Sequence, residues 1–372
     1  MNENSIVFES EGLNGDNAYS LYLYLKSNNF LDKYKITWLI DESNLLPDIG
    51  DSARIKKDIY KFDLRRSFLL ATSKYFIYDH FSVFDWKRYK KRKKHKIIFL
   101  THGCGFKAAT SSSKCLADEI YVTGKLYSYP VSMWCNCDIE KIIDLGYPRL
   151  DCFFQEINTN QRKLMKHLNF DSFKKVFLWM PTFRRSSCKS IDEDYFSSET
   201  GLPILYDEES LVTFDDFLKK ENALCIFKVH HLQASLNFFK KRYQNIYILK
   251  DEDIQKHNVL LYQFVMLTDC LITDYSSIST DYMLLDRPII YTMDDYEDYR
   301  NSRGFSIENP HNYFVGLHAY DEEQLFKCMK ECIENIDFYK EERKKTLPLM
   351  HTHNDGNSSA RILNHLGITL EK

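Results

Sequence analysis

Short runs of apolar residues recur along the chain, and most are separated by segments that have the periodicity of a helix. In the first half, the runs that predict strands are residues 5–8, 36–40, 75–78, 96–100, 120–122 and 142–145. Helical patterns lie between them at 17–26 and 67–74. Buried apolar strands that alternate with helices are typical of a parallel sheet covered on both faces.

The same alternation starts again after a polar, helix-like segment at 158–172. Strands are expected at 176–180, 223–228, 246–248, 270–273 and 288–291. Helices are expected at 214–222, 259–267, 277–285, 322–333 and 358–365. The pattern predicts two α/β halves that meet near residues 155–172, with a cleft between them. Ligands of such sheets bind at the carboxyl ends of the strands.

The composition fits a folded protein of the cytoplasm. The chain has 372 residues, of which 44% are apolar and 28% charged, enough for two domains and unlike a disordered chain. A net charge of -3 gives no overall basic field for nucleic acid. No apolar run reaches the roughly 18 residues that span a bilayer, and the first residues do not resemble a signal peptide. The ten cysteines include no C-x-x-C motif, so we expect reduced thiols and no metal site.

The strand at 96–100 leads into residues suited to a catalytic site. His102 follows it, and Gly103, Gly105 and Lys107 come next. Only 12 glycines occur in the chain, so two here indicate a backbone that a ligand approaches closely. A histidine at the end of a strand is well placed as a general base near neutral pH. The alternative is a tight turn that holds an ordinary histidine.

The strand at 270–273 ends in Thr273 and Asp274, and Ser276 and Ser277 follow before a predicted helix. One of the two serines is expected to cap the helix, with Asp281 in its first turn. The N–H groups and the positive dipole at a helix start favour an anion such as phosphate. A helix cap with nothing bound explains the pattern equally well.

Cations follow two further strands and also gather in one basic run. Thr182 and Arg184 follow 176–180, and the planar guanidinium of arginine suits a phosphate. Lys228 and His230 follow 223–228, where a histidine would neutralise charge on a phosphate. The run from Lys87 to Lys96 fits a solvated helix, or contact with an anionic membrane surface.

The order of the motifs resembles one family, the CDP-glycerol glycerophosphotransferases of teichoic acid and capsule synthesis. The motifs are F-E-S at 8–10, H-G-C-G-F-K at 102–107, L-G-Y-P-R-L-D at 145–151, P-T-F-R at 181–184, K-V-H at 228–230, I-T-D-Y-S-S-I-S-T-D-Y at 272–282, R-P-I-I-Y at 287–291, E-D-Y-R-N-S-R-G-F at 297–305 and D-G-N-S-S-A-R at 355–361. Three positions depart from the family pattern. Cys104-Gly105 replaces the usual T-P, Phe183 replaces Trp, and His231 replaces Pro.

The resemblance implies a GT-B-like fold, in which two Rossmann-like domains face a central cleft. We assign residues 1–165 to an acceptor-side domain and 166–345 to a CDP-polyol-binding domain, and we expect a helix within 346–372 to pack back on the first. Members are peripheral membrane proteins of the cell envelope, so we expect the chain on the inner face of the cell membrane. The donor would be CDP-glycerol or CDP-ribitol. The acceptor would be an undecaprenyl-diphosphate-linked saccharide or a growing polymer.

The resemblance also implies roles for single residues. His102 and His230 would be catalytic, and Arg184 and the segment 273–277 would hold the diphosphate of the donor. The full set of expected substrate contacts is Gly103, Gly105, Lys107, Arg149, Thr182, Arg184, Lys228, Thr273, Asp274, Ser276, Ser277 and Asp281.

The expected reaction is attack of an acceptor hydroxyl on the phosphorus that bears the polyol, with loss of CMP. His102 would remove the proton, and groups from the second half would stabilise the diphosphate, since phosphoryl transfer depends mainly on positioning and charge. We expect no cofactor and no metal. Two alternatives stay open: a GT-B glycosyltransferase that uses a nucleotide sugar, and a catalytically inactive scaffold in an assembly complex.

Overall fold

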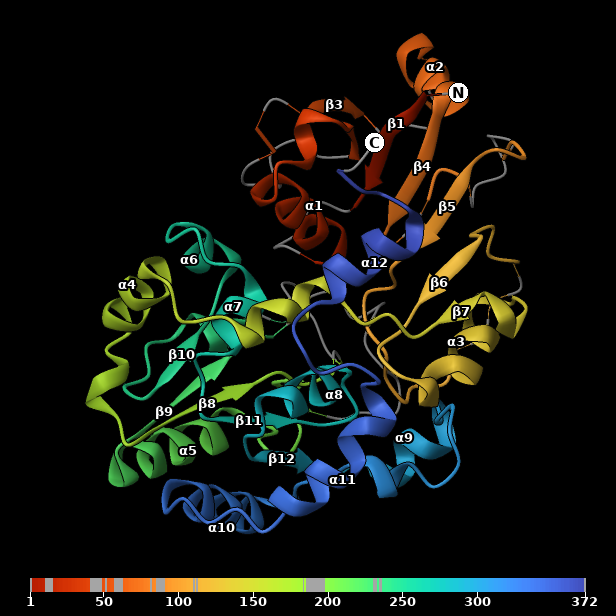
Figure 1. Ribbon diagram of the computed structural model, residues 1–372. Helices are drawn as coiled ribbons and strands as arrows, with labels where there is room; N and C mark the ends of the chain where they lie inside the picture. Colours follow the sequence, from red (N-terminus) through yellow and green to blue (C-terminus); the bar gives the residue numbers. More distant parts are fainter. Residues whose placement is uncertain are drawn as a thin grey trace.

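Two parallel sheets form the core of the protein, one in each half of the chain (Figure 1). The computed structural model describes residues 2–10, 16–40, 49–50, 52–56, 63–80, 82–84, 91–109, 111, 113–182, 184, 198–229, 233 and 236–370. The predicted α/β class is confirmed. Within these ranges, no helix has the length and apolar character that crossing a membrane requires.

The first sheet has seven strands in the order β3-β2-β1-β4-β5-β6-β7. They are β1 (Asn2–Glu9), β2 (Lys35–Ile40), β3 (Ala53–Lys56), β4 (Ser73–Tyr78), β5 (Lys96–Phe99), β6 (Glu119–Tyr121) and β7 (Ile142–Ile143). The chain first builds outward from β1 through β2 and β3, and then returns to β4 on the other side of β1. Its helices are α1 (Asn17–Ser27), α2 (Leu64–Thr72) and α3 (Ser128–Cys135).

The second sheet has six strands in the order β10-β9-β8-β11-β12-β13. They are β8 (Lys175–Trp179), β9 (Ala223–Phe227), β10 (Ile246–Ile248), β11 (Cys270–Thr273), β12 (Ile289–Thr292) and β13 (Leu317–Ala319). Strand β9 is buried at every position, as expected for a strand covered on both faces. The order reverses between β8 and β11, and this switch point brings the loops after these two strands together.

The helices of the second half are short except for α5 (Glu208–Glu221), α10 (Glu322–Ile333) and α11 (Lys340–Met350). The others are α6 (Asp251–Gln255), α7 (Leu261–Val265), α8 (Ile278–Tyr282) and α9 (Tyr296–Ser302), while α4 (Thr159–His167) precedes the second sheet. Local sequence explains the ends of α5. Asp207 forms a capping box at its start, and Asn222 adopts the left-handed conformation that ends it.

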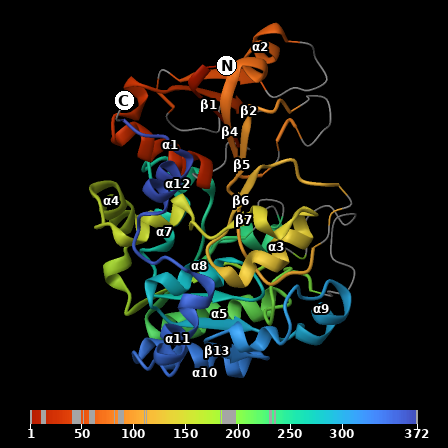
Figure 2. The same cartoon turned by 45° about the vertical axis from the view of Figure 1, so that its right-hand side comes forward.

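The last helix, α12 (Ser358–Leu366), returns to the first half and lies beside α1 (Figures 1 and 2). The carboxylate of Asp151 accepts hydrogen bonds from the backbone N–H groups of Ser358 and Ser359, at 2.8 and 2.9 Å. Asp151 lies in the 3-10 segment η4 (Pro148–Phe154), which also packs on α1. A side chain of the first half therefore fixes the start of the C-terminal helix. The exact domain limits stay a prediction.

Several elements differ from the expectation. The helix expected at 277–285 is only α8 followed by the 3-10 turn η8 (Met283–Leu285), and the one expected at 259–267 is shortened to α7. Strand β3 was not predicted from the apolar runs, because it is an edge strand whose residues are mostly exposed. Helix α11 was not predicted, and it contains Pro348, a residue that disfavours the interior of a helix.

Candidate functional site

A pocket of about 380 Å³ lies between the two halves, at the carboxyl ends of β5 and β11. Its wall is formed by the loop after β5, by α3, by the start of α8 and by the loop after α9. The lining residues are His102, Gly103, Cys104, Gly105, Lys107, Ala109, Pro130, Val131, Trp134, Ser277, Arg303 and Ser306. Five of the residues expected from the sequence therefore share one pocket, although Ser277 lies more than 160 positions from the others.

The imidazole of His102 opens to this pocket and is held between two other rings. It stacks on His80, with ring centroids 4.7 Å apart and planes 9° apart, and meets Trp134 edge-on at 5.5 Å. Its Nδ1 lies 3.3 Å from the carbonyl oxygen of Asp79. The residue is exposed to the pocket, but desolvation by the protein packed around its ring, reinforced by His80, lowers the pKa of His102. A neutral imidazole at physiological pH suits a general base.

The residue before His102 holds a rare backbone conformation. Thr101 has a φ of 53°, in the left-handed region that a β-branched residue seldom adopts. Its hydroxyl donates to the carbonyl of Tyr121 at 3.1 Å and also contacts the hydroxyl of Tyr147. Its own carbonyl accepts a hydrogen bond from Asn17. Buried contacts thus hold the strained turn that directs His102 into the pocket.

The two glycines after His102 serve a purpose that the sequence did not indicate. A Cβ added at Gly103 would lie 2.7 Å from Oγ of Ser277, and one at Gly105 would lie 3.1 Å from Cβ of the same serine. The hydroxyl of Thr280 also donates to the carbonyl of Cys104 at 3.0 Å. At both positions glycine therefore allows the second half of the protein to approach closely. Both glycines also line the pocket, and close approach of a ligand to them stays a prediction.

The start of α8 differs from the predicted helix cap. Ser277 stands at the cap position, but it has helical backbone angles and its side chain makes no capping hydrogen bond. Helix α8 is five residues long, so it supplies little of the dipole on which the anion prediction rested. The N–H group of Ser276 donates to Asp274 at 3.1 Å, and the buried hydroxyl of Thr273 donates to a backbone carbonyl. Of these residues, Ser277 alone lines the pocket described above.

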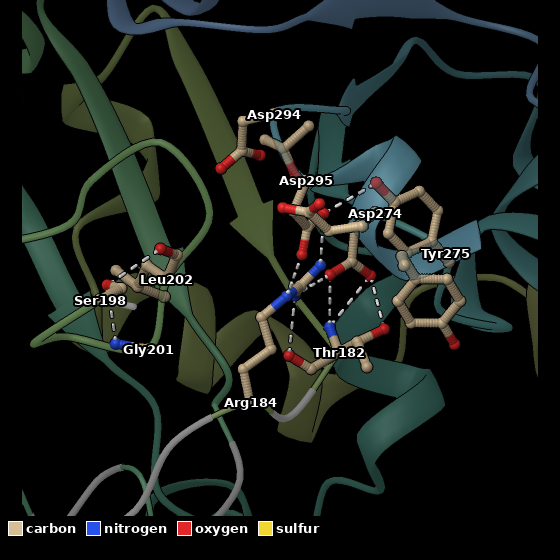
Figure 3. Close-up of polar contacts among 12 residues, drawn as sticks. Thr182, Arg184, Ser198, Gly201, Leu202, Asp274, Tyr275, Asp294 and Asp295 are labelled. Carbon is tan, nitrogen blue, oxygen red and sulfur yellow. Dashed lines mark hydrogen bonds and ion pairs between the residues drawn. The ribbon is translucent and has the colours of Figure 1, made fainter. Parts of the chain in front are cut away.

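Arg184 and Asp274 lie at the centre of a buried ion-pair network (Figure 3). Both are completely enclosed, and Nη1 of Arg184 donates to Oδ2 of Asp274. Nε and Nη2 of Arg184 donate to the two carboxylate oxygens of Asp295, at 2.7 and 3.1 Å. Thr182 donates to Asp274 from its N–H and its hydroxyl, and Tyr275 donates to Asp295.

One guanidinium faces two carboxylates in this network. Burial opposes ionisation of Asp274, but the cations of Arg184 and Lys107 outweigh it, so the pKa of Asp274 is lowered. Arg184 and Asp274 therefore join the loops after β8 and β11. Direct contact with a diphosphate stays a prediction for both residues.

Arg149 is likewise enclosed, and it connects the two halves beneath His102. Its Nη1 donates to Asp16 at 2.6 Å and to the carbonyl of His102 at 2.7 Å. Its Nη2 donates to Asp281 of α8 at 2.8 Å, and its guanidinium lies 4.5 Å from the ring centre of Tyr262. Arg149 and Asp281 thus join the His102 loop to the second half of the protein. Direct contact of either residue with substrate stays a prediction.

The remaining predicted residues do not join this pocket. Lys228 pairs with Asp251 at 2.9 Å and is not among the residues that line it. His230 and residues 87–90 of the basic run lie outside the described residues. Sequence reasoning missed Trp134, Arg303 and Ser306 as lining residues. Arg303 had a usable signal, because it belongs to the E-D-Y-R-N-S-R-G-F motif at 297–305.

One group could offer ligands to a metal ion. Asp16, Asp79 and His80 place ligand atoms within 4.8 Å of one another, the only such group in the part of the chain that the structure describes. Two of these residues already bind other groups. Asp16 pairs with Arg149, and Asp79 accepts a hydrogen bond from the N–H of Ala18. The geometry carries no metal assignment, and metal-independent chemistry stays a prediction.

The chain matches a family described as CDP-Glycerol:Poly(glycerophosphate) glycerophosphotransferase over residues 1–367. It is 30% identical over 233 residues to the teichoic acid ribitol-phosphate polymerase TarL of Staphylococcus aureus, covering 61% of this chain and 37% of TarL. It is 27% identical over 337 residues to a teichoic acid poly(glycerol phosphate) polymerase of Bacillus spizizenii, covering 82% and 77%. The chain thus spans well under half the length of TarL.

The fold also matches solved structures. The H548A variant of the wall teichoic acid polymerase TagF superimposes with a TM-score of 0.77 at 20% identity, covering 98% of this chain and 89% of that one. This likeness confirms the expected GT-B-like fold. A UDP-GlcNAc 2-epimerase from Neisseria meningitidis shares the fold more distantly, with a TM-score of 0.58 at 12% identity. With the match over nearly its full length, the chain belongs to the CDP-glycerol:poly(glycerophosphate) glycerophosphotransferase family.

Proposed function

We propose that the protein transfers a polyol phosphate from a CDP-polyol to a hydroxyl group of a lipid-linked saccharide or a growing polymer, with release of CMP. Glycerol phosphate is the first candidate for the transferred group, and ribitol phosphate is the second. The observation that carries the proposal is the pocket that His102 shares with Lys107, Ser277 and Arg303. Family membership supports a CDP-polyol as the donor.

The residues of the pocket suit the two needs of this reaction. His102 accepts the proton of the acceptor hydroxyl, whose oxygen then forms a bond to the phosphorus that bears the polyol. The bond from that phosphorus to the CMP oxygen breaks, and CMP leaves with the electron pair. The cations of Lys107 and Arg303 stabilise the charge that develops on the phosphate oxygens. His230 stays the proposed second catalytic histidine on the basis of its motif.

The donor is tested first by thermal unfolding with CDP-glycerol, CDP-ribitol, CMP and several UDP-sugars. A ligand at about 100 times its Kd stabilises a protein by about 2.7 kcal/mol, which gives a clear shift in Tm. Stabilisation by a CDP-polyol and by CMP, with no effect of the UDP-sugars, supports the proposal. Stabilisation by a UDP-sugar alone supports the glycosyltransferase, and no response to any nucleotide supports an inactive scaffold.

The role of His102 as the base is tested by measuring CMP release from the CDP-polyol that stabilises the protein. His102→Ala is expected to lower kcat by about 10²- to 10⁴-fold, because the acceptor hydroxyl loses its proton acceptor. His167→Ala is the matched control, since His167 is exposed and lies on α4, away from the pocket lining. Equal turnover in the two variants would remove His102 from the mechanism.

We further propose an anionic membrane surface as a partner, at one end of the first half. Leu64 and Phe68 are 73% and 72% exposed and lie one turn apart on α2. Helix α2 is at one end of the molecule in both views (Figures 1 and 2). Arg92 donates to the carbonyl of Ala71 on this helix, and this bond brings the exposed end of the basic run beside it. Apolar side chains next to lysines and arginines suit the interface of an anionic bilayer.

A further inference from the structure

A second histidine, His80, stacks on the ring of His102. The two residues follow adjacent parallel strands, because β4 pairs with β5 in register from Tyr75↔Lys96 to Tyr78↔Phe99. Their imidazole planes are nearly parallel, at 9°, with centroids 4.7 Å apart. No motif of the sequence points to His80, and the arrangement arises only when the strands pair.

Two carboxylates lie close to the ring nitrogens of His80. Its Nδ1 lies 2.9 Å from Oδ1 of Asp79, and its Nε2 lies 4.0 Å from Oδ2 of Asp16. Asp79 is completely buried, and its other oxygen accepts a hydrogen bond from the N–H of Ala18 at 3.0 Å. A buried carboxylate held in this way stabilises an imidazolium beside it.

We propose that His80 is a positioning residue for His102: its imidazolium, held by Asp79 and Asp16, fixes the plane of the His102 ring and keeps that ring neutral. This inference rests on the proposed role of His102 as the base. A second positive charge stacked at this distance is unfavourable, so His102 resists protonation. The Nδ1–H of His102 then points to the carbonyl of Asp79, which leaves Nε2 as the proton acceptor.

The other charged groups around His102 act in opposite directions. Asp16 and Asp79 raise its pKa, whereas Arg149 and His80 lower it, and burial of the ring is the largest cause of the net lowering. Of the four groups, His80 stacks directly on the ring of His102. It can therefore influence both the charge and the orientation of the base.

His80→Phe is the direct test, because phenylalanine keeps a stacked ring but carries no charge. CMP release is measured as kcat/KM against pH for the full chain. In the variant, we expect the fall of kcat/KM on the acid side of the pH profile to occur about one pH unit higher than in wild type. The reason is that His102 takes up a proton more readily without the charge of His80. A rate that falls equally at every pH, with the limb unmoved, would show a merely structural role and overturn the proposal.

Titration of the histidine side chains by NMR separates this inference from the proposed function. The signal of His102 is assigned by its loss in His102→Asn, and its midpoint is compared between wild type and His80→Phe without any substrate. A higher midpoint in the variant supports the inference even if CMP release is never observed. An unchanged midpoint overturns it. If His80→Phe fails to fold, His80→Gln takes its place in both measurements.

Discussion

Gly103 and Ser277 touch where the two halves of the protein close on each other. An added Cβ at Gly103 would lie 2.7 Å from Oγ of Ser277 and 3.8 Å from Nη2 of Arg149. The loop that carries His102 is thus fitted against the loop after β11. Small changes at this contact are expected to alter how the pocket closes.

Gly103→Ala is expected to destabilise the protein by about 1–3 kcal/mol, because the new methyl group overlaps the Ser277 hydroxyl. Urea unfolding measures the loss. Combining Gly103→Ala with Ser277→Gly removes the atoms in conflict and should restore much of the stability. If the double variant is as unstable as the sum of its single variants, the two residues do not meet in solution.

Arg184→Met is expected to lower the free energy of unfolding by about 3–5 kcal/mol, because it leaves the carboxylates of Asp274 and Asp295 buried without their cation. Chemical denaturation measures this change. Arg303→Met is the matched control: this exposed arginine lines the pocket, so its variant should keep its stability and lose CMP release. A stable Arg184→Met variant that no longer binds CDP-glycerol would instead support direct contact with the diphosphate.

His351 should make stability depend on pH. The residue is buried, its Nε2 lies 2.8 Å from the carbonyl of Thr280 on α8, and burial lowers its pKa from the ordinary value near 6.5. The unfolded chain binds a proton near that pH while the folded protein does not, so stability falls as the pH falls. The slope from this one residue is at most about 1.4 kcal/mol per pH unit.

His351→Gln tests this origin, because the glutamine amide can still donate to Thr280 but does not titrate. Urea unfolding between about pH 5 and 7 should show a shallower loss of stability in the variant than in wild type. Identical slopes would assign the pH dependence to other histidines, such as the buried His95 and the half-buried His318, whose pKa values desolvation also lowers.

Membrane binding should depend on the exposed face of α2. The double variant Leu64→Ser with Phe68→Ser is expected to sediment less with vesicles that contain anionic phosphatidylglycerol, because the apolar anchor is lost. Phe338→Ser is the control, since Phe338 is 68% exposed and lies outside α2. Higher salt should weaken wild-type binding. Equal sedimentation of both variants would place the contact elsewhere.

The local pattern of the sequence was enough to find most of the strands. Runs such as 97–100 and 270–272 are apolar at consecutive positions because both faces of β5 and β11 are buried. Strand β3 lies at an edge of the sheet and carries mostly exposed residues, so it left no such signal. The same reading placed His102 and Ser277 at the ends of strands, where they share the pocket.

By itself, the sequence therefore determined the α/β class, the order of the motifs and the identity of the loops that meet at the switch points. The tertiary structure decided which side chains neutralise each other. Arg184 pairs with Asp274 and Asp295 across 90 and 111 positions, and His80 stacks on His102 because two strands lie side by side. Motif spacing shows where a charged residue lies along the chain, but its partner depends on how distant segments pack around it.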